Sequence, residues 1–260
     1  MRIHSTLSTA CLAWMLTCSA TSLFAQTSDP TFPVNGTYDK ALGATVLEHG
    51  TVHVDATTTL EDGTVVLHRG RIVAVGPSAT TRFDGPSMIL DMTGLHVYPS
   101  FVDVHSAFGT PEVQSAGWSR TPQDFSDKKG AYGWNEAVRP ETSAAAVFDP
   151  SAETAKSIRE AGFGAVLTHV QDGVVRGTGA VVLPLDDPRE ALLSPSASFH
   201  MSFRKGSSSQ NYPSSLMGAT ALLRQTHLDA AWYAHAAPQS AAGGTNLSLE
   251  AFVAADDLPR

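Results

Sequence analysis

The hydrophobic pattern of the chain changes at Phe101, and this change limits the folds that the chain can adopt. Between residues 45 and 98, short β-branched runs alternate with Gly and Asp, as in "GTVVLHRGRIVAVG" and "SMILDM". Such runs with turn residues between them are typical of antiparallel strands, and Arg69-Gly70 predicts a tight hairpin. The strands are too few and too short to form a core alone. We therefore expect residues 44–98 to form a module of the β-sandwich type.

The residues after Phe101 predict an α/β region. "SFVDVH" predicts a buried strand, the first of a parallel sheet, and the residues that follow it show no sustained period as far as residue 145. Trp118, Tyr132 and Trp134 in this stretch predict a packed loop rather than a disordered one. "DPSAETAKSIREAGFGAVLTHV" then predicts a helix followed by a strand, with Asp149 as the helix cap. "GTGAVVLPL" predicts another strand, and residues 213–237 predict a long helix.

The first 25 residues have the features of a secretory signal peptide. Arg2 is their one charged residue, an apolar run follows it, and "SLFAQ" predicts cleavage after Ala25. Residues 26–43 are rich in turn residues and predict a flexible lead-in. We expect an exported bacterial protein, located in the periplasm or outside the cell. Cys11 and Cys18 lie in the signal segment, so the mature chain contains no disulfide, thiolate ligand or cysteine nucleophile.

The charge of the chain argues against two classes of partner. The net charge is -8, from 25 acidic and 17 basic residues, and the sequence contains no basic run. A protein of this charge is a poor partner for nucleic acid and for an anionic membrane surface.

The order of elements and one motif resemble the amidohydrolase superfamily, in particular the imidazolonepropionase-like metal-dependent hydrolases. In that family a small β-sandwich leads into a (β/α)₈ barrel whose first strand reads Pro-Gly-Phe-Ile-Asp-x-His-x-His-x-Gly. Here "PSFVDVHSAFG", residues 99–109, follows this template with Ser100 in place of Gly and Ala107 in place of the second His. The preceding "GTVVLHRGRIVAVGPS" and "ILDMTGLHVYPS" are similar to the segments that lead into the family's barrel.

This resemblance implies an α/β fold in which residues 99–260 form an incomplete (β/α)₈ TIM-barrel-like region. It implies a hydrolase that uses zinc or another divalent metal and acts on carbon–nitrogen bonds other than peptide bonds. The candidate metal ligands are His105 and His169, which end two predicted strands. Ala107 supplies no lone pair, whereas catalytic zinc usually has three protein ligands. We therefore expect a partial or degenerate copy, with a small-molecule substrate and with the remaining barrel segment or a second hydrolase domain as a partner.

Two function classes remain open from the sequence. The first is the metal-dependent hydrolase, and the second is a non-catalytic amidohydrolase-like module that binds a small molecule or acts as a scaffold in a larger exported protein. A carbohydrate-binding β-sandwich fits the α/β pattern less well.

Other motifs predict no site. His49 and His53 would lie roughly 13 Å apart on a strand, and His227 and His235 are expected at the surface of the last helix. "RKGSSSQ", residues 204–210, lacks the residue order of a phosphate-binding loop.

Overall fold

The computed structural model describes residues 43–117, 120–236, 244–255 and 258, and it divides into two units between Tyr98 and Pro99. The predicted signal peptide, residues 1–25, and all of the predicted lead-in except Gly43 lie outside the described residues. No helix in the described ranges is long and apolar enough to cross a membrane.

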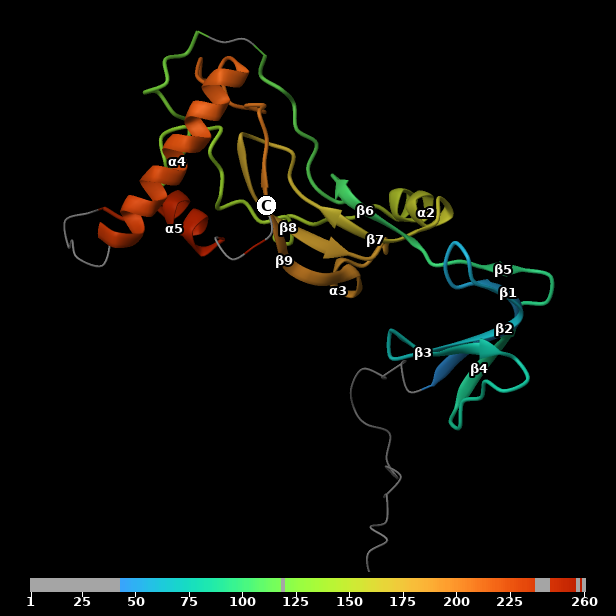
Figure 1. Cartoon of the computed structure of the whole chain (residues 1–260). Helices are drawn as coiled ribbons and strands as arrows, with labels where there is room; N and C mark the ends of the chain where they lie inside the picture. The colour runs from blue at the N-terminus through green and yellow to red at the C-terminus, as the bar shows by residue number, and fades with distance from the viewer. Residues whose placement is uncertain (1–42, 118–119, 237–243, 256–257, 259–260) are drawn as a thin grey trace, which may run out of the picture. The chain divides into compact units, whose positions relative to one another are not determined.

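The first unit is built around one five-stranded sheet (Figure 1). Its strands are β1 (Ala44–His53), β2 (Thr59–His68), β3 (Arg71–Pro77), β4 (Ser87–Asp91) and β5 (His96–Val97). The order is β3-β2-β1-β4, with antiparallel pairs β1–β2 and β2–β3. Both β4 and β5 pair in parallel with β1, at successive stretches of the same strand.

The predicted hairpin at Arg69-Gly70 is confirmed. His68 pairs with Arg71, so the loop has two residues, and both have positive φ, 51° and 70°. Two positive φ values suit the right-handed twist of a two-residue hairpin. The predicted sandwich is not seen in residues 43–98, which form one layer. The reason is that β4 and β5 extend the hydrogen-bonded edge of β1 instead of forming a second sheet.

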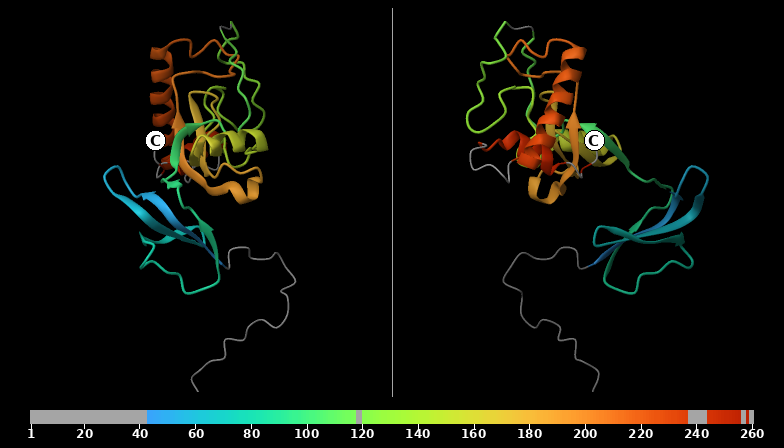
Figure 2. Two further views of the ribbon diagram at one scale, coloured as in Figure 1. Left: turned by 90° about the vertical axis from the view of Figure 1, so that its right-hand side faces the viewer. Right: turned by 60° about the vertical axis from the view of Figure 1, so that its left-hand side comes forward.

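The second unit combines a four-stranded sheet with helices and long loops. Its elements are β6 (Phe101–Ser106), α2 (Ala152–Glu160), β7 (Phe163–Thr168), β8 (Val175–Val182), α3 (Pro188–Ala191), β9 (Leu192–Met201), α4 (Leu216–Ala236) and α5 (Leu247–Ala254). The sheet order is β6-β7-β8-β9. Figure 2 shows this sheet from two further sides. No closed barrel is present among the described residues.

The predicted parallel pairing of the Phe101–His105 strand is confirmed, because β6 pairs in parallel with β7 after the crossover through α2. The rest of the sheet differs from a parallel barrel, since β7–β8 and β8–β9 are antiparallel. The connection between β7 and β8, residues 169–174, is too short for the crossover that parallel neighbours require. The second sheet is therefore mixed.

The prediction that the β6 strand is buried was wrong. β6 is an edge strand of this sheet, and Phe101, Val102 and Val104 are all exposed. Only β7 covers one of its hydrogen-bonding edges among the described residues. An apolar run therefore identified the strand correctly but did not indicate its position in the sheet.

Helix α2 begins at a different cap from the predicted one. Ser151 is the N-cap, and its side chain accepts a hydrogen bond from Thr154 N at 3.2 Å. Asp149 instead donates a hydrogen bond from its backbone N–H to the carbonyl oxygen of Gly109 at 2.7 Å. The helix ends at Glu160 with Ala161 as its C-cap, and Gly162 stops it as predicted, with a φ of 90° that is favourable only for glycine.

The long irregular segment between β6 and α2 is packed, as predicted. Of the three aromatic residues in the prediction, Trp118 lies outside the described residues, and Tyr132 and Trp134 are exposed. The residues from Asn135 to Val138 are buried instead. Isolated bridges attach this segment to β8 at Val138–Val175 and Ser143–Thr178.

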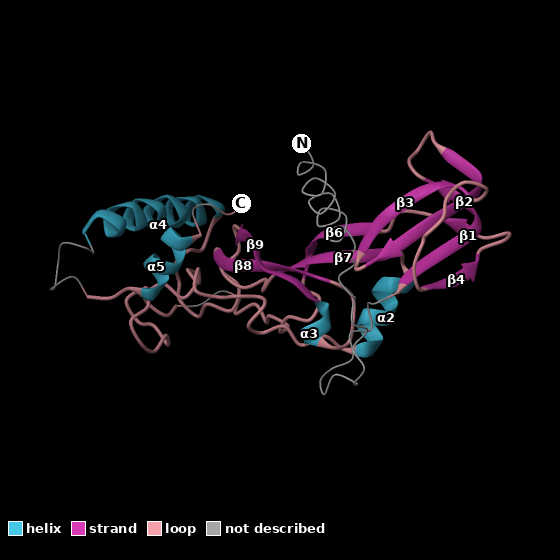
Figure 3. Ribbon diagram, turned by 90° about the horizontal axis from the view of Figure 1, so that it is seen from below, coloured by secondary structure: helices cyan, strands magenta, loops and turns pink. Residues whose placement is uncertain are grey.

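Two clusters of buried apolar side chains form the core of the second unit. One lies between the β8–β9 strands and helices α4 and α5, which lie side by side in Figures 1 and 3. Its members include Val175, Phe199, Leu222 and Phe252. Tyr233 of α4 donates a hydrogen bond to Glu250 of α5 at 2.9 Å and fixes the pair. The other cluster joins α2 to β7 and β8 and contains Phe108 and Phe148.

Gly177 is the position in β8 at which substitution is expected to be most damaging. Its φ is 81°, and a Cβ there would collide with the backbone carbonyl of Thr142. We expect Gly177→Ala to lower the free energy of unfolding by about 2–4 kcal/mol, from left-handed strain and the displaced carbonyl. Urea denaturation followed by tryptophan fluorescence measures this loss. Gly244→Ala, at a position with open space, is the control and should change stability little.

Candidate functional site: a histidine cluster beside a cationic pocket

Three histidines on or directly after three strands of one sheet meet in the second unit. His105 is on β6, His169 directly follows β7, and His200 is on β9. The rings of His105 and His169 are edge to face with centroids 4.7 Å apart. The rings of His169 and His200 are stacked, with centroids 3.8 Å apart and planes parallel within 1°. The structure thus brings the two predicted candidates together and adds a third.

Burial and neighbouring charges keep the two inner histidines neutral. His169 is 1% exposed, and burial lowers its pKa to about 3, with His200, His105 and Arg176 adding to the shift. Burial likewise lowers the pKa of His200 to about 4, with His105 and Arg176 contributing. The positive form of each ring is disfavoured because water is excluded and a guanidinium is close.

Hydrogen bonds determine the tautomer of His169. The Arg176 Nη1 atom lies 3.3 Å from His169 Nε2, and a guanidinium can only donate. Nε2 therefore accepts, and the proton of the neutral ring is on Nδ1. That nitrogen is buried and has no hydrogen-bond partner among the described residues. His200 Nε2 lies 2.7 Å from Ser198 Oγ.

This arrangement does not fit a zinc site. Imidazole binds a metal through a lone pair in the plane of its ring, and two parallel planes 3.8 Å apart do not direct lone pairs at one ion. The Arg176 guanidinium already occupies His169 Nε2 and places a positive charge there. No group of three or more His, Cys, Asp or Glu side chains that could hold a metal ion occurs in the described part of the chain.

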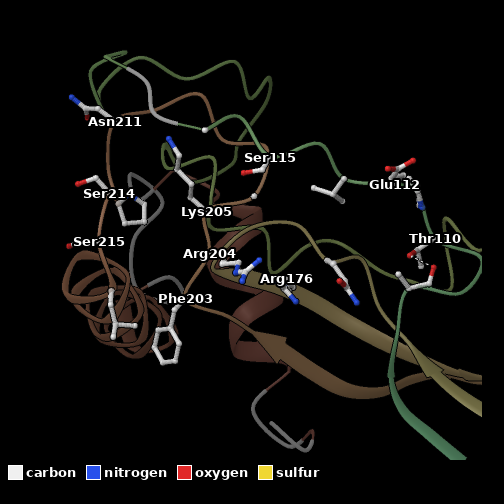
Figure 4. A pocket seen from close by; sticks show the side chains of 18 residues that line it. Thr110, Glu112, Ser115, Arg176, Phe203, Arg204, Lys205, Asn211, Ser214 and Ser215 are labelled. Atoms are coloured by element: carbon white, nitrogen blue, oxygen red, sulfur yellow. Dashed lines mark hydrogen bonds between the residues drawn. The ribbon is translucent and has the colours of Figure 1, made fainter.

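A large pocket lies next to the histidine cluster. Its volume is about 910 Å³, and its wall includes Ala107, just after β6, and Arg176 of β8. Further lining residues come from the segment after β6, the segment after β9 and the start of α4; those labelled in Figure 4 include Thr110, Glu112, Ser115, Phe203, Arg204, Lys205, Asn211, Ser214 and Ser215. Arg176 belongs both to this wall and to the hydrogen bond with His169, so it links the pocket to the cluster.

The predicted template residues have definite places in this site. Asp103 Oδ1 accepts a hydrogen bond from the backbone of His105 at 3.0 Å, which is the role of a backbone-binding carboxylate. His105 is exposed. Ala107, which stands where the family template has a histidine, faces the pocket.

Two histidine pairs that sequence reasoning set aside are also apart from this site. His49 pairs with Asp62 at 2.9 Å, whereas His53 stacks on Tyr98. The two histidines of β1 therefore have different partners. His227 and His235 are both exposed on α4.

Sequence reasoning missed His200 and the role of residues 204 and 205. His200 lies in "SASFHM", a stretch of alternating polarity that could have indicated a strand. Arg204 and Lys205 belong to "RKGSSSQ", which has no phosphate-loop order, yet both side chains line the pocket. The loop of residues 204–210 is fixed in place by two hydrogen bonds of 2.7 Å, which Ser207 donates from N and Oγ to the carboxylate of Asp172.

Comparison with solved structures places the fold. An amidohydrolase from Thermotoga maritima matches with a TM-score of 0.59 and 21% sequence identity, over 80% of this chain. The chain shares the amidohydrolase fold over part of its length. It spans about half of that protein, since 54% of the Thermotoga chain is covered. This confirms the resemblance predicted from residues 45–109 at the level of fold.

The other comparisons add little. A prolidase complexed with N-methylphosphonate-L-proline matches at 22% identity over 47% of this chain and 25% of its own, with a TM-score of 0.27 that is too low to bear on the fold. No protein-family model matches the chain. No curated protein matches it either.

Proposed function

We propose that this chain is an exported amidohydrolase-like protein of the type that hydrolyses carbon–nitrogen bonds other than peptide bonds, in a partial or degenerate form. The observation that carries the proposal is the pocket at the end of β6, the first strand of the amidohydrolase-like region. It includes residue 107, which stands in the family template's metal-ligand position, and it is large enough for a small molecule. In barrel-type folds, sites of this kind gather at the carboxyl ends of the strands.

The described residues support binding and orientation of a small molecule more than they support bond cleavage. The metal that the family implies does not fit the stacked pair His169 and His200, so no step is assigned to it. The mature chain has no cysteine nucleophile, and the sequence contains no Gly-x-Ser-x-Gly elbow. The pocket supplies polar and apolar walls that can hold a ligand beside the end of β6.

A second candidate function is a non-catalytic amidohydrolase-like module that binds a small molecule or acts as a scaffold in a larger exported protein. Ala107 favours this alternative, because it removes a ligand from the template. So does the hydrogen bond of Arg176 to His169 Nε2, because it uses a lone pair that a metal would need. Zinc binding and hydrolysis by the purified chain distinguish the two candidates.

We expect the purified, chelator-treated chain to bind zinc weakly and to hydrolyse few or none of a panel of simple and cyclic amides. Isothermal titration calorimetry with zinc and product detection by chromatography measure the two properties. Ala107→His should tighten zinc binding by about tenfold or more, since it restores the second histidine of the family template two residues after His105. His235→Gln, on the exposed part of α4, is the control.

Two outcomes would contradict this proposal in different ways. Tight stoichiometric zinc binding by the unaltered chain, accompanied by hydrolysis, would show a complete metal centre with ligands outside the histidine cluster. An unchanged zinc affinity in Ala107→His would show that His105 and residue 107 do not share one metal-binding side.

A further inference from the structure

The pocket beside the histidine cluster has an excess of positive charge. Its lining contains three basic residues, Arg176, Arg204 and Lys205, and one acidic residue, Glu112. The whole chain carries a net charge of -8, so this pocket is opposite in sign to the protein around it. Figure 4 shows the side chains of Arg204 and Arg176 next to each other, with Lys205 above them.

The carboxylate of Asp172 is engaged mainly by other groups than the pocket's arginines. Asp172 acts on Arg176 electrostatically, but its oxygens are used by Ser207 and by Arg139, whose Nη1 lies 2.9 Å from Oδ2. Arg176 donates hydrogen bonds from Nε to the carbonyl oxygen of Gly173 and from Nη1 to His169 Nε2. Within the described ranges, no hydrogen bond or ion pair uses Arg176 Nη2 or the guanidinium of Arg204. Two neighbouring guanidinium groups thus have free donors at the pocket wall.

The rest of the pocket suits an anion with an apolar body. Ser214, Ser215 and Leu216 line it at the start of α4, a 21-residue helix whose amino-terminal end carries a partial positive charge. Phe203 and Leu216 add exposed apolar surface to the same wall. A fork of guanidinium donors matches the paired oxygens of a carboxylate or phosphate.

We infer that this pocket binds a small organic anion, with its carboxylate or phosphate against Arg176 and Arg204 and its apolar part against Phe203. The inference rests on the proposed function, because it names the class of small molecule that the same site receives. It is independent of catalysis, since binding of such an anion requires only the pocket walls.

Calorimetric titration of the whole purified chain, at constant low ionic strength, tests this inference with probes that contain no carbon–nitrogen bond. Phenylacetate and phenyl phosphate are the anionic probes, and the tighter of the two identifies the preferred charged group. 2-Phenylethanol has a similar apolar body without the charge and should bind at least about tenfold more weakly, because hydrogen bonds to charged groups contribute more than neutral ones. Because no probe can be hydrolysed at a carbon–nitrogen bond, a failure of hydrolysis leaves this test intact.

Variants assign the binding to the two arginines. Arg204→Gln should weaken binding of the tighter anion by about tenfold, and it should preserve the fold because its side chain makes no hydrogen bond within the described ranges. Arg176→Gln should weaken it at least as much. Arg189→Gln, which removes the same charge from exposed α3 outside the pocket, should leave the affinity unchanged within about twofold, since surface ion pairs contribute little.

Three results would overturn the inference. One is that neither anion binds saturably to the unaltered chain. Another is that 2-phenylethanol binds as tightly as the anions. The last is that Arg189→Gln loses as much affinity as Arg204→Gln, which would show a general effect of net charge.

Discussion

Replacing Gln210 with Ala is expected to lower the free energy of unfolding of the second unit by about 3–4 kcal/mol, because the backbone groups of four other residues lose their hydrogen-bond partner at once. Gln210 is fully buried. Its Nε2 donates to the carbonyls of Gln123, Phe125 and Trp134 at 2.8–3.0 Å, and its Oε1 accepts from Glu136 N at 2.9 Å. One side chain thus attaches the irregular segment between β6 and α2 to the segment that precedes α4.

Urea denaturation of the whole chain, followed by tryptophan fluorescence, measures this effect. Trp134 and Trp232 both belong to the second unit and report on its unfolding. Gln114→Ala is the matched control, because Gln114 is exposed and its amide donates a hydrogen bond to Glu112 at 3.2 Å, its one side-chain partner among the described residues. Its loss should stay below about 0.5 kcal/mol. Gln210→Glu separates hydrogen bonding from packing. It keeps the volume but turns a donor into an acceptor facing three carbonyls, so it should destabilise at least as strongly. A well-tolerated Gln210→Glu would show that packing alone holds the segment.

Acid is expected to destabilise the second unit between pH 6.5 and pH 4 through His169 and His200. Their pKa values in the folded chain are about 3 and about 4, below the ordinary value of 6.5. As the pH falls through 6.5, the unfolded chain takes up protons that the folded chain refuses, so folding stability decreases. Each histidine contributes up to about 1.4 kcal/mol per pH unit in this window. The loss from pH 7 to pH 5 should therefore be on the order of 2–4 kcal/mol.

The double variant His169→Gln, His200→Gln tests the origin of this pH dependence. Glutamine does not titrate, and at position 169 it can still accept a hydrogen bond from Arg176. Stability measured by urea denaturation at pH 7, 6 and 5 should become nearly independent of pH in the double variant. His235→Gln, which removes an exposed histidine of α4, should retain the slope of the unaltered chain. An unchanged slope in the double variant would assign the acid sensitivity to other groups.

Part of this architecture could be predicted from the sequence because it depends on local chemistry. The hairpin at Arg69-Gly70 needs two residues that tolerate positive φ between alternating strands, and the end of α2 needs a glycine at residue 162. The parallel pairing of β6 with β7 follows from the helix between them. The template in residues 99–109 indicated the amidohydrolase fold, and Ala107 showed that its metal motif is incomplete.

The remaining features depend on contacts between residues that are distant in the sequence. An apolar run such as "SFVDVH" has the same pattern at the edge of a sheet as at its centre, so only strand order shows that β6 is exposed. The hydrogen bonds of Gln210 span 74 residues and more, and no local period records them. The sequence by itself determined the hairpin at Arg69-Gly70, the parallel pair of β6 and β7, and the missing histidine. Only the tertiary structure decided that His200 stacks on His169 and that Arg176 and Arg204 share one pocket, because these side chains come from different segments of the chain and meet only after the sheet has formed.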